Sequence, residues 1–182
     1  MLSAFPVLRQ ASLVGLALSS ALLLQPSAAS AASLSTKDVR IVGVVLGFLD
    51  PPSPGGNIAV IYSGSSAASK ADADAIVASF GDGVSSKGGS MQAKAVDAAS
   101  LGDGTGYIGI IVAAGVDGNA GITAAKAHHI PCITASLATV QGGQCIMTVQ
   151  SDPKLQITVN HDAASAAGVV FSPAFRMLIH EI

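Results

Sequence analysis

Two uninterrupted apolar runs in the sequence admit few folds. Residues 57–62 read N-I-A-V-I-Y and residues 107–113 read Y-I-G-I-I-V-A. Continuous runs rich in β-branched residues are typical of strands that are buried on both faces of a parallel sheet. An alanine-rich segment over residues 67–80 follows the first run and carries its larger apolar residues on one side, which predicts a helix. Strand, loop and helix in this order indicate an α/β fold.

The rest of the chain extends this pattern. The apolar spacing predicts an opening helix over residues 37–49, a helix over 120–128 and a short strand over 130–134. Residues 91–96 alternate between apolar and polar, which is typical of a half-exposed strand at the edge of a sheet. Residues 144–150 and 155–159 are strand-like and flank a tight turn at 151–154, so they predict an antiparallel hairpin.

A last helix is expected after the hairpin. Ser172 followed by Pro173 is typical of a helix start. An apolar stripe that would pack this helix on the domain is formed by Phe175, Leu178, Ile179 and Ile182. We therefore expect an α/β sandwich of two or three layers, with a mixed, mainly parallel sheet and a C-terminal antiparallel hairpin plus helix.

The first residues have the three-part layout of a secretory signal. Arg9 precedes an apolar run from Leu13 to Leu24, and small residues follow, with the expected cleavage site at 29–31. The run is about a dozen residues long, well below the roughly twenty that a membrane-spanning helix needs. We therefore expect residues 1–31 to be a cleaved signal peptide, in preference to a retained anchor. Residues 32–182 should form a single domain that works outside the cytoplasm.

Charge and composition argue against nucleic acid as a partner. The chain has a formal net charge of -2, and its lysines are scattered singly. Proteins that bind nucleic acids or anionic membranes usually carry clustered Lys and Arg. With no Trp and 4% aromatic residues, the chain also lacks the stacking surfaces that single strands require.

Cys132 and Cys145 are the only cysteines. An even number in an exported protein permits one disulfide, and closing a loop of this size would stabilise the fold by roughly 3 kcal/mol. Two buried free thiols are the alternative, and a bridge requires residues 136–140 to make a longer excursion than a simple hairpin. The cysteine spacing does not fit a zinc site, and adjacent His128 and His129 would point different ways on a helix. We predict no metal and no cofactor.

Two loops are candidates for ligand binding. Residues 104–109 match the string G-x-G-x-x-G, but they run into a strand instead of opening a helix, so the dinucleotide geometry is missing. Ser63, Gly64, Ser65 and Ser66 lie between a strand and a helix N-terminus, where backbone N–H groups and hydroxyls could hold an anion. This loop lacks the lysine of a P-loop, and a simple helix cap is the competing interpretation.

No group of residues predicts catalysis. The chain has no G-x-S-x-G string, and the proximity of His128 to Cys132 has less weight if the cysteine is bridged. His161 and Asp162 could form a dyad, although Asp162 also fits a helix cap. Three further aspartates, Asp82, Asp103 and Asp117, each precede a glycine, and Asp-Gly pairs are typical of turns, so catalysis is not needed to account for them. We therefore expect no enzyme activity.

The C-terminal third carries a spaced set of small residues. Gly142 and Gly143 open a strand, Asn160 ends the strand at 156–159, and the step Ala163-Ala164 follows. With the strand at 130–134, this order resembles the end of the YfiR-like family of exported bacterial proteins. The first helix departs from the family, because residues 48–51 read F-L-D-P where members usually carry Trp-Pro.

The resemblance implies a function as well as a fold. Members of the YfiR-like family are periplasmic α/β proteins, often dimeric, that restrain an inner-membrane diguanylate cyclase in cyclic-di-GMP signalling by contacting its periplasmic sensor region. The resemblance implies no catalysis, and it suggests structural roles for Gly142, Gly143 and Asn160. Two alternatives stay open: a small solute-binding module that uses the Ser63 to Ser66 loop, and an unrecognised hydrolase.

Overall fold

One mixed sheet organises the computed structural model, which describes residues 32–182. The sheet has 8 strands in the order β2-β3-β1-β4-β5-β6-β7-β8. Their bounds are β1 Gly56–Tyr62, β2 Val84–Ser86, β3 Gly89–Asp97, β4 Tyr107–Val112, β5 Cys132–Thr134, β6 Met147–Gln150, β7 Gln156–Val159 and β8 His180–Glu181. The predicted signal peptide, residues 1–31, lies outside the described residues.

The strand directions agree with the expected fold class. β1 pairs in parallel with β3 and β4, and the parallel arrangement continues from β4 through β5 to β6. β6 and β7 form the predicted antiparallel hairpin, and β8 adds to β7 in parallel. The sheet is therefore mixed and mainly parallel.

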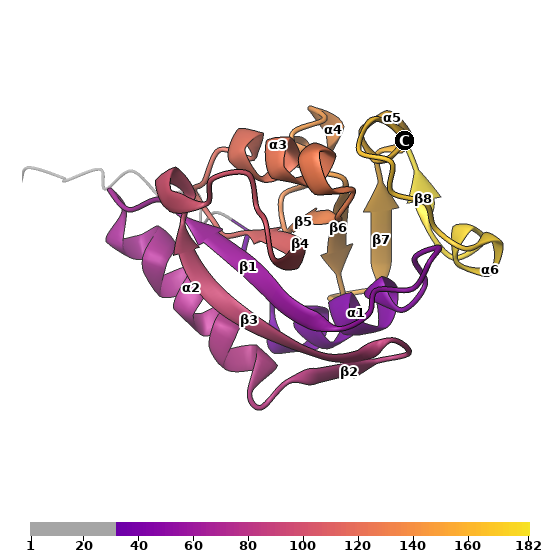
Figure 1. The fold of residues 1–182 in the computed structure, drawn as a ribbon, viewed down its shortest axis with the longest axis horizontal. Coiled ribbons are helices and arrows are strands. Elements are labelled where there is room, and N and C mark those ends of the chain that lie inside the picture. The colour runs from indigo at the N-terminus through magenta and orange to yellow at the C-terminus, as the bar shows by residue number, and fades with distance from the viewer. Residues whose placement is uncertain (1–31) are drawn as a thin grey trace, which may run out of the picture.

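Helices cover both faces of the sheet. Their bounds are α1 Thr36–Leu46, α2 Ala67–Phe80, α3 Asn119–His128, α4 Leu137–Gln141, α5 His161–Ala166 and α6 Pro173–Arg176. Figure 1 shows α1 and α2 together on one side of the strands and α3 on the other, which gives three layers. Ile58, Val60, Ile110 and Ile111 in the two central strands are 0% exposed, as continuous apolar runs predict.

The two long helices of the first half begin at side-chain caps. Ser35 caps α1, and its backbone N–H donates to the Asp38 carboxylate at 2.8 Å, while the Ser35 hydroxyl oxygen accepts from the Asp38 N–H at 3.2 Å. At the start of α2, the Ser66 hydroxyl oxygen accepts from the Ser69 N–H. Such caps satisfy backbone donors that have no partner within the helix.

Two expected elements differ in the structure. Residues 91–96 lie in β3, which is not an edge strand, because the short β2 pairs antiparallel with its outer side. The last helix ends at Arg176, so Phe175 is 2% exposed whereas Leu178 is 72% exposed. Residues 180–181 form β8 where the apolar stripe predicted a further helical turn.

Within residues 32–182, no helix is long and apolar enough to cross a membrane.

Candidate functional site

A crevice lies where the connections after β1 and β4 diverge. The chain leaves β1 for α2 and leaves β4 for α3, and these helices lie on opposite faces of the sheet (Figure 1). In open α/β sheets, ligands bind at this kind of point, outside the carboxyl ends of the strands. The crevice has a volume of about 700 Å³, and its polar lining consists of Ser63, Ser65, Asp97 and Asp117.

The serine loop after β1 forms one wall of this crevice. Ser66 is used as the cap of α2, and the buried Ser69 hydroxyl accepts from the Ser63 N–H at 3.1 Å. The hydroxyls of Ser63 and Ser65 hydrogen-bond to each other at 2.9 Å, and both residues line the crevice. Local capping thus engages Ser66 and leaves Ser63 and Ser65 facing the crevice.

The charge of the crevice is negative. The Asp97 carboxylate lies against Gly64 so closely that a side chain at Gly64 would collide with it. Asp117 lines the crevice as well, and no Lys or Arg does. The two carboxylates oppose the anion that the serine loop suggested, and they favour a neutral polar or cationic solute. Asp97 was missed because the parallel pairing of β1 with β3 brings it beside the loop from a distant part of the sequence.

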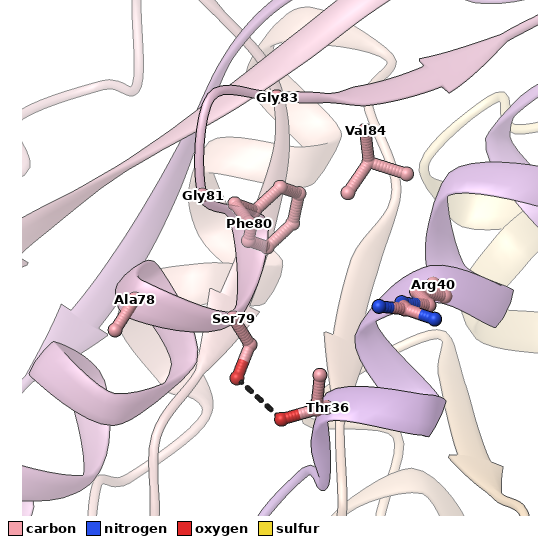
Figure 2. Close-up of a pocket in the computed structure, with 8 residues that line it drawn as sticks. All are labelled: Thr36, Arg40, Ala78, Ser79, Phe80, Gly81, Gly83 and Val84. Atoms are coloured by element: carbon pink, nitrogen blue, oxygen red, sulfur yellow. Dashed lines mark hydrogen bonds between the residues drawn. The ribbon is translucent and has the colours of Figure 1, made fainter.

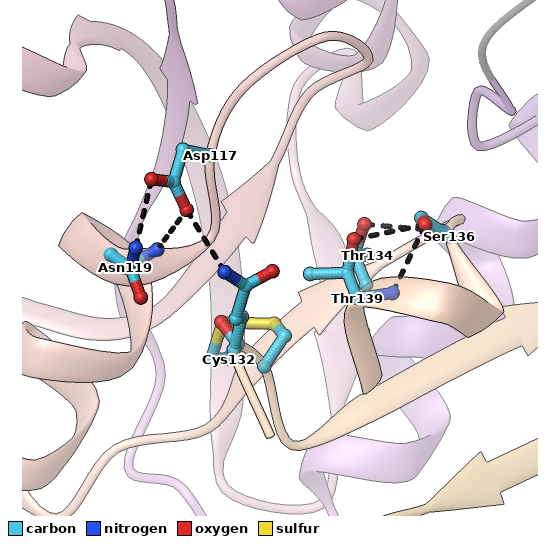
Figure 3. Close-up of a disulfide and its surroundings, with 8 residues drawn as sticks. Asp117, Asn119, Cys132, Thr134, Ser136 and Thr139 are labelled. Atoms are coloured by element: carbon cyan, nitrogen blue, oxygen red, sulfur yellow. Dashed lines mark hydrogen bonds between the residues drawn. A yellow bond between two sulfur atoms is a disulfide. The ribbon is translucent and has the colours of Figure 1, made fainter. Parts of the chain in front are cut away.

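Asp117 is fixed by polar contacts beside the disulfide. It accepts from the Asn119 backbone N–H at 3.0 Å and from the Asn119 side-chain amide at 2.8 Å. The Gln144 side-chain amide also donates to Asp117, at 3.4 Å. Figure 3 shows Asp117 and Asn119 near the disulfide of Cys132, and the bond from Gln144 ties the loop after β4 to the turn that precedes β6.

Cys132 and Cys145 form a disulfide, and both are 0% exposed. Their Cα atoms are 5.1 Å apart. The excursion that the bridge required is α4, which carries the chain away from the sheet after β5 and returns it before β6. Cys132 is therefore not available as a nucleophile for His128.

The motif positions of the C-terminal third meet at one backbone carbonyl. The Asn160 side-chain amide donates to the Val140 carbonyl at 2.8 Å, and the Gly143 N–H donates to the same oxygen at 3.0 Å. The Asn160 side-chain oxygen accepts from the Ala163 N–H at 2.8 Å and caps α5. Gly143 has φ +69°, a left-handed conformation that glycine adopts most readily, and Gly142 ends α4. These residues join α4 to α5 and leave no group directed at a ligand.

Three polar residues, Asp103, Thr105 and His128, lie together on the surface. His128 Nε2 lies 3.5 Å from the Asp103 carboxylate and 3.3 Å from the Thr105 hydroxyl. Hydrogen bonds from Thr105, together with the nearby imidazole, lower the pKa of Asp103. Thr105 also donates to Asp103 through its backbone N–H, as in an Asx turn, so a turn accounts for the arrangement.

The remaining candidates do not converge. His161 lies 4.0 Å from Glu181, not against Asp162, and Glu181 also pairs with Arg176 at 3.1 Å. Hydrogen bonding to Arg176 and the charges of Arg176 and His161 lower the pKa of Glu181. In the described part of the chain, no three His, Cys, Asp or Glu side chains gather as a metal site would require.

A second hollow lies between α1 and the end of α2. It has a volume of about 630 Å³ and is lined by Arg40 and the end of α2. The Thr36 and Ser79 hydroxyls hydrogen-bond to each other at 3.0 Å, and Figure 2 shows this contact between α1 and α2. The carboxyl end of a helix carries partial negative charge, so α2 itself works against an anion near Arg40.

Comparisons with known proteins establish the fold only. No protein family and no curated protein sequence matches the chain. Among solved structures, the chain is similar to the ABC domain in complex with L-Trp from Streptococcus pneumonia, with a TM-score of 0.51 and 13% identity. The similarity covers 80% of this chain and 59% of that one, so the chain spans under two thirds of its neighbour's length.

Proposed function

We propose that this chain is an exported regulatory binding protein that works in the periplasm. Its partner would be the periplasmic sensor region of a membrane-bound diguanylate cyclase, which it restrains without catalysing a reaction. The likeness of the C-terminal third to the YfiR-like family supports the class of protein. The observation that carries the proposal is a group of exposed apolar side chains in that same third.

These side chains belong to the end of the chain. Met177 is 83% exposed, Leu178 72%, Val170 56% and Ile182 42%. Single exposed apolar residues are normal, whereas apolar side chains that gather on a surface are typical of a contact with another protein. All four of these residues lie within residues 170–182. We call these four residues the C-terminal apolar surface.

The segment that carries this surface is well anchored. Phe175 stacks on Phe48 with ring centroids 5.3 Å apart, and Arg176 pairs with Glu181. The Ser172 N–H donates to the Phe48 carbonyl at 2.8 Å. An anchored backbone loses little conformational freedom on binding, so apolar side chains on it can contribute most of their burial energy to a complex.

Capture from membranes tests the proposal. Tagged protein should capture a cyclase, and deletion of the gene should raise cyclic-di-GMP. The double variant Met177→Ser/Leu178→Ser should lose the cyclase and keep its melting temperature, because both side chains are exposed. Val44→Ser is the matched control, since Val44 is 56% exposed on α1 and lies outside the surface.

Two results would contradict the proposal. The first is that no cyclase is captured and deletion leaves cyclic-di-GMP unchanged. The second is that the double variant and Val44→Ser behave alike. Light scattering on the purified protein measures whether it forms the dimer that the family resemblance implies.

A small solute-binding module is the second candidate function. The crevice between the β1 and β4 loops favours it, because it lies where ligands of open α/β sheets bind. The structural neighbour with this fold holds L-Trp, which makes free amino acids a reasonable first set to screen. A ligand at a hundred times its dissociation constant should stabilise the fold by about 2.7 kcal/mol. The alanine variant of Ser63 and Ser65 should abolish that shift, and the absence of any hit among amino acids, sugars and small ions would count against this function.

A further inference from the structure

A groove at the opposite end of the sheet is lined by apolar and acceptor groups. It lies at the amino ends of β1 and β4 and has a volume of about 360 Å³. One wall is the proline-rich segment that joins α1 to β1, and the other combines Ile108 and Pro131 with Val169 and Val170. Small-molecule sites are typically apolar clefts of roughly this size with a few polar groups.

The two walls are joined by backbone hydrogen bonds. The Asp50 N–H donates to the Val170 carbonyl at 2.9 Å, and Leu49 forms an antiparallel bridge with Phe171. The groove is therefore built from ordered segments that hold each other in place.

Ser53 is the first polar group of the groove. It is 5% exposed, it lines the groove, and its hydroxyl has no hydrogen-bond partner among the described residues. Buried hydroxyls are rarely left without a partner, so an unpaired hydroxyl in a groove indicates a missing polar group.

His129 supplies a second polar group, in a fixed orientation. Its Nδ1 lies 2.9 Å from the Ala167 carbonyl, and since a carbonyl can only accept, Nδ1 carries the proton. The Nε2 atom of the neutral ring is then an acceptor. His129 is the one non-glycine residue with positive φ in the described chain (φ 54°), and a side chain at Gly168 would collide with its ring. This left-handed residue is the C-cap of α3, where such a conformation commonly ends a helix, and it leaves the imidazole beside the groove.

The charge of the groove decides what it would bind. Asp50 is its only Asp, Glu, Lys or Arg, and no ion pair to it is formed within the described residues. The Tyr107 ring also lines the groove, and aromatic faces attract cations. A ligand that matches these groups has a positive charge, hydrogen-bond donors and an apolar body.

We infer that this groove binds a small organic amine, with an ammonium group that donates to Asp50, Ser53 or His129 and an apolar body that lies against the prolines. An ammonium has three donors and no acceptor, which fits a groove whose polar side chains, Asp50, Ser53 and His129, can each accept a hydrogen bond. The groove shares Val170 with the C-terminal apolar surface, but its polar residues Asp50, Ser53 and His129 belong neither to that surface nor to the crevice at the carboxyl ends of the strands.

Calorimetric titration of the purified protein with phenethylamine tests this site. Phenylpropionate is the matched control ligand, because it has a similar shape and the opposite charge. Phenethylamine should bind and phenylpropionate should not. Asp50→Asn and Ser53→Ala should each weaken the binding of phenethylamine, by tenfold or more for Asp50→Asn. Asp82→Asn removes an exposed carboxylate in the turn after α2 and should leave the affinity unchanged.

The place where phenethylamine binds can be found by NMR, from the changes in backbone amide chemical shifts on titration. Shifts confined to Tyr107, Ile108 and His129 would support the groove. Shifts at Ser63 and Asp117, equal loss of affinity in Asp50→Asn and Asp82→Asn, or no binding of phenethylamine at millimolar concentration would each overturn it. Ser53→Ala keeps the test decisive if Asp50→Asn fails to fold.

Discussion

Substitution of Asn160 tests whether this residue stabilises the fold or contacts a partner. The Asn160 side chain makes two hydrogen bonds, one that caps α5 and one that reaches the Val140 carbonyl. Loss of an N-cap costs about 1 kcal/mol, and loss of the second bond costs about 1 kcal/mol. The Val140 carbonyl keeps its bond from Gly143, so it is not left without a partner and the second cost stays small.

Two variants resolve these contributions. Asn160→Ala loses both bonds and should lower the free energy of unfolding by about 2 kcal/mol. Asn160→Ser keeps a capping oxygen but cannot reach Val140, so it should lose about 1 kcal/mol. Urea unfolding measures both, and an unchanged dependence on urea concentration would indicate that the denatured state is unaffected.

The stability of the two Asn160 variants can also refute a structural role of this residue. If both variants unfold within about 0.5 kcal/mol of the wild type, the hydrogen bonds of Asn160 do not stabilise the junction of α4 and α5. Loss of partner capture by a fully folded Asn160→Ser protein would instead place Asn160 in the contact surface, contrary to a structural role.

Three further outcomes are expected. Reduction of the Cys132–Cys145 bridge should cost about 3 kcal/mol in urea unfolding, and two alkylatable thiols in the unfolded, unreduced protein would refute the bridge. Gly143→Ala should cost about 1 kcal/mol because of its positive φ, whereas Gly142→Ala, at φ -75°, should be nearly neutral in the same assay. Burial raises the pKa of Asp38, but the nearby Ser151 and the hydrogen bonds with Ser35 outweigh this effect, so the pKa lies below its usual value. The ionised Asp38 therefore stabilises the fold above about pH 4, and this contribution disappears as the pH falls through the lowered pKa. Asp38→Asn should cost about 1 kcal/mol at neutral pH, and the difference in stability from the wild type should shrink as the pH falls through the lowered pKa of Asp38. A difference that does not change with pH would contradict the role of the charge.

Elements with strong local patterns could be predicted from the sequence. The helix expected at residues 67–80 has the bounds of α2, because Ser66 caps its start and Gly81 follows its end. β1 and β4 were predictable because continuous apolar runs need burial on both faces. β2 was not, since a three-residue strand between glycine-rich turns has no periodicity of its own, and its absence from the prediction made β3 look like an edge.

The candidate site was predictable only in part. The position of Ser63 between a strand and a helix follows from local sequence, and so does the cap at Ser66. The charge around Ser63 does not, because Asp97 belongs to β3 and reaches the loop only through the pairing of β3 with β1. Likewise, nothing in the sequence associates Ser53 with His129, because only the fold brings their segments together.

The end of the chain shows why helical periodicity misjudged burial. Phe175 and Leu178 are spaced for one face of a helix, but the backbone after Met177 pairs with β7 instead. The Ile182 N–H donates to the Val159 carbonyl at 2.9 Å, and the His161 N–H donates to the Ile182 carbonyl at 3.0 Å. A longer helix would have left the edge of β7 without these partners, so strand pairing satisfies more backbone groups. The same pairing leaves Leu178 exposed, which turns an expected core residue into part of the C-terminal apolar surface.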